Sequence, residues 1–169
     1  MTLIEELQQG GELFQKTYNA LHVCWTKPND GEIEFRISKT ADGGFDVILH
    51  ANDKEIIVYG LGAHQHIDAE QTPCATVDRA LGLTYDLLTP NMRIAEYAVA
   101  GKPYQWKMQI LINDTWKTYA TTRLLTWTLF RKTSKTIFQN SQLPIREEAV
   151  ELRAAALCRW RGSTQSVNR

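Results

Sequence analysis

The sequence predicts an α+β fold, in which a twisted antiparallel sheet of about six to eight strands is packed by N-terminal, middle and C-terminal helices. Helical spacing of apolar residues near both ends and in the middle of the chain is the first observation behind this prediction. The second is the alternation of apolar and polar residues in the segments between them. The third is the shortness of the turns, such as Ala41-Asp42-Gly43-Gly44, because short connections join antiparallel strands.

The first helix is expected over residues 3–25. Thr2 and Glu5 have the spacing of a capping box, in which each side chain accepts a hydrogen bond from the other residue's backbone. Gly10-Gly11 interrupts the apolar stripe, so the helix breaks there, kinks there, or lets another part of the chain approach closely. The stripe consists of Leu3, Leu7, Phe14, Tyr18, Leu21 and Trp25.

Three strands follow, over residues 33–37, 45–49 and 55–59, because apolar residues alternate with polar ones. Residues 60–68 are interpreted as a polar loop. A second helix is expected over residues 73–88, with Thr72 as its N-cap and a proline in its first turn. Its buried stripe comprises Cys74, Val77, Leu81, Tyr85 and Leu88.

The second half returns to strands. They are expected over residues 92–99, 104–112 and 116–123, and an extended segment 124–130 is expected to pair with residues 135–139. Residues 146–160 are expected to form the C-terminal helix, with glutamates early and arginines late, as the helix dipole favours.

The length of 169 residues suits one core, so residues 1–161 are expected to form a single domain and residues 162–169 a disordered tail. Cys24, Cys74 and Cys158 include no CxxC pair, and we interpret them as buried or half-buried thiols in a reducing compartment. The N-terminus is acidic and no apolar run is long enough to cross a bilayer. A cytoplasmic location without membrane attachment is therefore expected.

The formal net charge is zero, but the charges are divided between the two halves. Residues 1–90 contain 6 Lys+Arg and 14 Asp+Glu (−8), whereas residues 91–169 contain 13 Lys+Arg and 5 Asp+Glu (+8). This division indicates that the halves pack on each other or on a second copy. Binding of nucleic acid by the basic half is the less favoured interpretation, because the basic residues are scattered.

His64-x-His66-x-Asp68 is the sharpest candidate for chemistry. In extended backbone, residues two apart point the same way, so these side chains can converge on zinc or another divalent metal, with His50 or Glu70 as a further ligand. A metal-dependent hydrolase is the function that such a site predicts. The alternative is a polar loop whose histidines cap the next helix or contact water.

This pattern resembles the first part of the metallo-β-lactamase superfamily signature, which implies a zinc hydrolase. In that signature a second histidine follows the aspartate directly, and Ala69 occupies that position here. The family also uses later histidines, and this chain has none after His66. We therefore do not assign the family.

Two further groups of residues suggest chemistry. Cys74 near a helix start, with His64 and His66 a short loop away, has the composition of a Cys–His pair, although a structural cysteine is the favoured interpretation. Basic and aromatic side chains alternate further on, which suits an anionic partner or single-stranded nucleic acid; charged guards on a sheet edge are the alternative. The residues of this second group are Arg123, Trp127, Arg131, Lys132 and Lys135.

The order of helix, three strands, helix, further strands and helix is similar to that of type III secretion chaperones, which implies a small, dimeric binding module. The sequence departs from that family in having more than two strands after the middle helix and a basic second half. We expect a small cytoplasmic binding or interaction module, homodimeric and without a cofactor, rather than an enzyme. Its partner is expected to be a protein or a small molecule.

Overall fold

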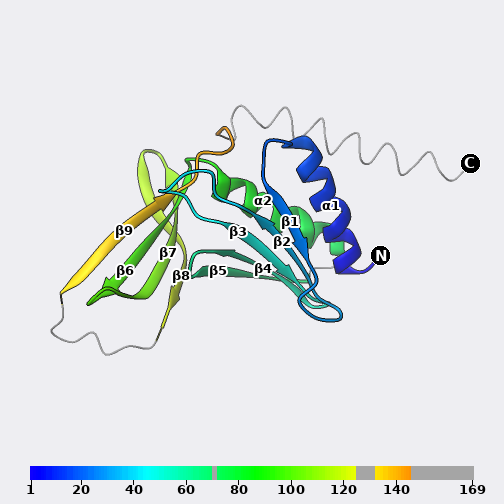
Figure 1. Cartoon of the computed structure of the whole chain (residues 1–169), viewed down its shortest axis with the longest axis horizontal. Helices are drawn as coiled ribbons and strands as arrows, with labels where there is room; N and C mark the ends of the chain where they lie inside the picture. Colours follow the sequence, from blue (N-terminus) through cyan, green and yellow to red (C-terminus); the bar gives the residue numbers. More distant parts are fainter. Residues whose placement is uncertain (70–71, 125–131, 146–169) are drawn as a thin grey trace, which may run out of the picture.

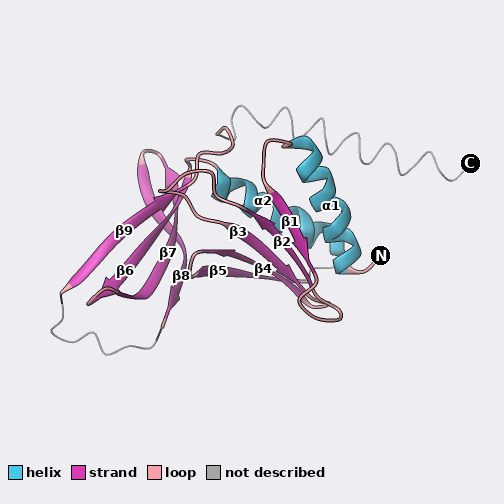
Figure 2. Ribbon diagram, in the orientation of Figure 1, coloured by secondary structure: helices cyan, strands magenta, loops and turns pink. Residues whose placement is uncertain are grey.

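The computed structural model describes residues 1–69, 72–124 and 132–145. These residues form two helices, α1 (Leu3–Thr17) and α2 (Pro73–Leu88), and nine strands (Figure 2). The strands are β1 (Val23–Thr26), β2 (Ile33–Ile37), β3 (Val47–Ala51), β4 (Glu55–Gly60), β5 (Ala63–Asp68), β6 (Met92–Val99), β7 (Lys102–Ile112), β8 (Thr115–Arg123) and β9 (Thr133–Gln139).

The strands form two antiparallel sheets rather than the single predicted one. Sheet A has the order β1-β2-β3-β4-β5 and sheet B the order β8-β7-β6-β9. The α+β class is confirmed. The prediction of a single sheet of about six to eight strands was wrong, because long twisted sheets tend to split into two packed sheets. The predicted helix 146–160 and tail 162–169 lie outside the described residues, and the domain boundaries stay a prediction.

Both helices lie on one face of sheet A, and sheet B stands at the far end of that layer (Figure 1). Alternate residues of β2, β3 and β4 point toward the helices and are fully buried, among them Phe35, Leu49 and Val58. The opposite residues of the same strands are partly exposed. Sheet A therefore has one face in the core and one face free of helices. No helix among the described residues has the length and hydropathy that crossing a membrane requires.

The first helix ends earlier than predicted. The capping box is present, with Thr2 Oγ1 accepting from the Glu5 backbone and Glu5 Oε2 accepting from the Thr2 backbone. The helix stops at Thr17, and residues 23–26 form β1 instead of a last helical turn. The valine and tryptophan of this segment favour a strand, and Trp25 packs its ring 4.4 Å from that of Phe35. The apolar stripe therefore predicted that Trp25 packs against the core, but it did not predict that its backbone forms a strand.

Gly10 and Gly11 allow close approach, which was one of the three predicted alternatives. The helix continues through both residues. A Cβ on Gly11 would lie 2.5 Å from the Trp25 ring, and one on Gly10 would lie 2.9 Å from a methyl of Val77 in α2. The glycines therefore let α1 lie against both β1 and α2.

Residues 63–68, predicted as a loop, form strand β5. The chain turns tightly after β4, with Leu61 at a positive φ of 52°, and β5 then pairs along the whole length of β4. Ala63 and Ile67 are buried toward the helices, while His64 and His66 point to the helix-free face. Gln65 interrupts the apolar side of the alternation, which is why the sequence did not reveal the strand.

The two sheets meet at glycines near the β4–β5 turn. A Cβ on Gly60 would lie 2.7 Å from the Ile94 side chain of β6, and one on Gly62 would lie 2.3 Å from the Trp106 indole of β7. Trp106 is held in place because its Nε1 donates to the Glu96 carboxylate at 2.8 Å. Sheet B therefore rests directly on the backbone of sheet A.

A buried amide joins three separated parts of the chain. The Asn140 side chain, after β9, accepts from the Phe45 backbone N–H and donates to the carbonyls of Phe45 and Leu87, each at 3.1 Å. Nearby, the Tyr85 hydroxyl donates to the Pro144 carbonyl at 2.8 Å. These bonds attach the segment after sheet B to α2 and to the approach of β3.

Strand β9 pairs with β6, from Arg93–Gln139 to Val99–Thr133. The predicted partner of residues 135–139, the segment 124–130, lies outside the described residues beyond Leu124, so that pairing stays a prediction. The prediction for the cysteines holds in part. Cys74 is half-buried but Cys24 is exposed, because it points to the helix-free side of β1, and Cys158 lies outside the described residues.

Gly62→Ala should lower the free energy of unfolding by about 1–3 kcal/mol, because the new methyl overlaps an indole that a hydrogen bond holds in place. Gly43→Ala is the matched control, since a Cβ on Gly43 has no atom within 4 Å. Urea unfolding followed by tryptophan fluorescence measures both. Equal stability of the two variants would show that the sheets do not depend on this contact.

Candidate functional site

The helix-free face of sheet A carries polar and ionisable side chains on neighbouring strands. Residues paired across strands point to the same side of a sheet, so the register of β2 to β5 defines two rows on this face. The first row runs Glu34, His50, Ile57 and His66, and the second runs Arg36, Ile48, Tyr59 and His64.

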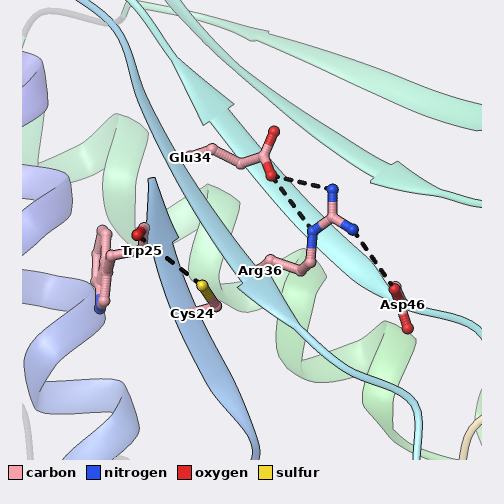
Figure 3. Close-up of polar contacts among 5 residues, drawn as sticks. All are labelled: Cys24, Trp25, Glu34, Arg36 and Asp46. Carbon is pink, nitrogen blue, oxygen red and sulfur yellow. Dashed lines mark hydrogen bonds and ion pairs between the residues drawn. The ribbon is translucent and has the colours of Figure 1, made fainter. Parts of the chain in front are cut away.

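Carboxylates on this face are partly paired. Arg36 lies between Glu34 and Asp46, with N–O distances of 3.2 and 3.8 Å (Figure 3). His50 Nε2 lies 3.8 Å from the Glu32 carboxylate. All five of these side chains come from the acidic first half of the chain.

His64 and His66 lie side by side on β5. Their ring centroids are 5.2 Å apart with an interplanar angle of 74°. His66 Nδ1 is 2.6 Å from Glu55 Oε2 on β4, and the His66 side chain is 51% exposed. The bond to Glu55 orients the ring of His66 and leaves its Nε2 on the opposite side of the ring.

His64 is attached to sheet B. Its backbone N–H donates to Thr122 Oγ1 at 3.2 Å, and its ring Nδ1 is 3.5 Å from the same oxygen. On the other side its ring is 5.6 Å from that of Tyr59. Thr122 on β8 therefore links the histidine strand to the second sheet.

A groove lies between β5 and β8 at this link. It has a volume of about 450 Å³ and is shallow and widely open to solvent. The residues that line it are His64, Gln65, His66, Ala120, Thr121, Thr122 and Arg123. The pair of imidazoles therefore borders a space that also contains hydroxyls and a guanidinium.

Two of the three predicted metal ligands are brought together. Asp68 is exposed at the end of β5, where it pairs with Glu55 of β4. The carboxylate in contact with His66 is that of Glu55. His50 is two strands from β5, about 10 Å away at ordinary strand spacing. Glu70 lies outside the described residues. Among those that are described, no group of three His, Cys, Asp or Glu residues has an arrangement that would hold a metal ion.

A second candidate surface lies on sheet B, on the face turned away from sheet A. Arg123, Gln105, Tyr97 and Lys135 form one cross-strand row over all four strands. The adjacent rows add Lys107 and Arg93 to the same side. We call this surface, with Arg93, Tyr97, Lys107, Trp116, Arg123 and Lys135, the cationic face.

Aromatic rings on the cationic face support the cations. The Arg93 guanidinium lies 4.0 Å from the centroid of the Trp116 ring, and its Nε donates to Gln109 Oε1 at 2.9 Å. The ammonium groups of Lys107 and Lys135 lie 5.3 and 5.9 Å from the Tyr97 ring. Burial lowers the pKa of Arg93, an effect that Tyr97 opposes, and the guanidinium remains charged near neutral pH.

The predicted basic cluster is placed only in part. Arg123 and Lys135 lie on the cationic face, at opposite edges of sheet B. Lys132 is exposed but precedes β9, and Trp127 and Arg131 lie outside the described residues. The sequence did not single out Arg93 or Lys107. For Lys107, the alternation over residues 104–112 was the available signal, because it puts this lysine on the polar side of its strand together with the glutamines.

The cations of this face have no carboxylate partner in the part of the chain that the structure describes. The ion pairs found there join Arg36, His50 and His66 to carboxylates of the first half. The ion pairs among these residues therefore do not join the acidic half to the basic half, as packing of the two charged halves on each other had predicted.

Comparison of the chain with models of protein families found no match, and comparisons with curated proteins and with solved structures found none either.

Tyr59 is the residue of the helix-free face whose pKa is shifted. Burial, followed by the nearby Glu55 and Glu34 carboxylates, raises the pKa of Tyr59 above its ordinary value of 10.0. The folded state then holds the phenol proton more tightly than the unfolded state, so this contribution to stability is present below the unfolded pKa and is lost as the pH rises through the folded one.

Tyr59→Phe should therefore lose less stability than the wild type as the pH rises past the ordinary tyrosine pKa of 10.0, while the difference between the two proteins stays constant well below it. Urea unfolding at several pH values measures the difference. Parallel curves for the two proteins over the whole range would contradict the assignment of this titration to Tyr59.

Proposed function

We propose that this protein is a non-enzymatic binding module that holds an anionic partner on the cationic face of sheet B. The observation that carries the proposal is the placement of four cations on one side of a four-stranded sheet, without a carboxylate partner among the described residues. These cations are Arg93, Lys107, Arg123 and Lys135.

The spacing on this face suits an extended partner. Arg123 and Lys135 are separated by three strand intervals, about 14 Å at ordinary strand spacing. Lys107 lies between these edges, and Arg93 lies further along β6. A polymer with repeated negative charges contacts several of these side chains at once, whereas a single small anion contacts one or two of them.

The aromatic rings add to this preference. A guanidinium that stacks on an indole on one side, as Arg93 does on Trp116, offers its other side to a planar group of the partner. Gln109, which is buried on the same face, accepts from Arg93 Nε and so helps to hold that guanidinium in position. Charge thus provides attraction, and the rings provide planar contacts.

A second copy of the chain is one source of negative charge. The helix-free face of sheet A has Glu32, Glu34, Asp46, Glu55 and Asp68 around a single arginine. Self-association of the kind predicted from the sequence therefore belongs to the same proposal, with the acidic face of one protomer as the partner. Sedimentation of the protein alone at low and high salt reports it.

The binding prediction concerns salt and charge. A fluorescein-labelled single-stranded oligonucleotide should bind with an affinity that falls as salt rises from about 50 to about 200 mM, by about 0.7 logarithmic units per phosphate contact in each decade of salt. The double variant Arg123→Gln/Lys135→Gln should reduce that slope by about 1.4, because it removes two contacts. Fluorescence anisotropy provides the measurement, and a labelled polyglutamate peptide is the second ligand.

Lys16→Gln/Lys117→Gln is the matched control, since it makes the same change in net charge away from the cationic face. Lys16 is exposed on α1, and Lys117 pairs with Ile110 on the opposite side of sheet B. Preference for the oligonucleotide or the peptide identifies the class of partner. An equal loss of affinity in both double variants, or binding of neither ligand with no salt-dependent self-association, would overturn the proposal.

A further inference from the structure

The histidine pair on β5 is the strongest feature that the proposed function does not use. His64 and His66 project from the same side of one strand with ring centroids 5.2 Å apart. Two imidazoles that share a tetrahedral metal ion at metal–nitrogen distances of about 2.0–2.1 Å have centroids roughly 5 Å apart. The strand thus holds the two rings at a centroid separation that is compatible with a shared metal ion.

The Nδ1 atoms of both rings have partners that suit metal ligation. Metal-binding histidines commonly donate one ring N–H to a carboxylate or another oxygen, and the other nitrogen then binds the metal. His66 Nδ1 lies 2.6 Å from the Glu55 carboxylate, and His64 Nδ1 lies 3.5 Å from the Thr122 hydroxyl. With the proton on Nδ1, the lone pair is on Nε2 in each ring.

The surroundings leave room for the remaining ligands. The groove of about 450 Å³ beside the pair holds several waters or a small anion. Thr121, Thr122 and Arg123 line the same groove, and their hydroxyls and guanidinium suit an anionic ligand of the metal. Because no third His, Cys, Asp or Glu of the described residues completes the site, the metal would keep exchangeable positions.

We infer that His64 and His66 form a two-histidine site for a borderline divalent cation, zinc in the first place, with Glu55 as the residue that orients His66. Imidazole nitrogen is a preferred ligand of zinc, copper and nickel and a poor one for magnesium and calcium. The inference does not depend on the anionic partner proposed above, because zinc alone is the probe and neither histidine belongs to the cationic face. Arg123 alone belongs to that face and also lines the groove.

The test is titration of tag-free protein with zinc chloride by isothermal calorimetry. Cys24→Ser serves as the background, since the exposed Cys24 thiol is a competing ligand. One zinc per chain should bind. His64→Ala and His66→Ala should each abolish this saturable binding, and Glu55→Gln should weaken it about 10–100-fold.

His50→Ala is the matched control and should leave zinc affinity unchanged, because His50 is on the same face but pairs with Glu32. The fold of each variant is checked by circular dichroism. Imidazole ¹H–¹⁵N spectra provide a second readout, in which zinc should shift Nε2 of both rings and leave the protons on Nδ1.

Three results would overturn the inference. The first is the absence of zinc binding. The second is a loss of zinc affinity in His50→Ala equal to that in the His64 and His66 variants. The third is a His66 ring that carries protons on both nitrogens and keeps them when zinc is added. The last result would identify the His66–Glu55 contact as a simple ion pair on the surface.

Discussion

The contact between the two sheets at Gly60 and Gly62 is the constraint on which the rest of the structure depends. Without a side chain at these positions, Ile94 and Trp106 of sheet B lie directly on the backbone of the β4–β5 hairpin. That approach places β8 alongside β5. Thr122 consequently reaches His64, and the groove forms between the two strands. Two backbone positions thus determine where the candidate chemistry is located.

The opposite charges of the two halves correspond to two surfaces on different sheets. Four carboxylates of the first half, Glu32, Glu34, Asp46 and Glu55, gather on the helix-free face of sheet A, around Arg36 and the histidines. Four cations of the second half, Arg93, Lys107, Arg123 and Lys135, gather on the outer face of sheet B, where three of them lie against aromatic rings. Because antiparallel strands alternate their side chains, each half hides its apolar residues on one face and concentrates its charge on the other.

The sequence predicted the elements better than it predicted their assembly. Alternation identified β2, β6 and β7, and capping chemistry identified the start of each helix, since these signals are local. It missed β1, whose aromatic residue also fits a helical stripe, and β5, whose alternation Gln65 interrupts. The division into two sheets depends on contacts between distant residues, such as Gly62 with Trp106, that no local pattern records.

The same distinction applies to the candidate site. The His64-x-His66 spacing was informative because side chains two apart on a strand share a face, whichever elements surround them. Glu55 was not predicted as the partner of His66, because that contact depends on the register of β4 against β5. The sequence predicted Arg123 and Lys135 of the cationic face but not Arg93 or Lys107, since the rows of this face cross strands that are far apart in the sequence.

The Asn140 hydrogen bonds also have a consequence for the order in which the chain folds during synthesis. They join residues that are 95 positions apart, so the core around Phe45 is completed only after the ribosome has released almost all of sheet B. Until then, sheet A and its helices emerge with the surface at Gly60 and Gly62 uncovered. Since contacts of such long range close slowly, the nascent first half passes through a period in which apolar surface is open to chaperones or to other chains.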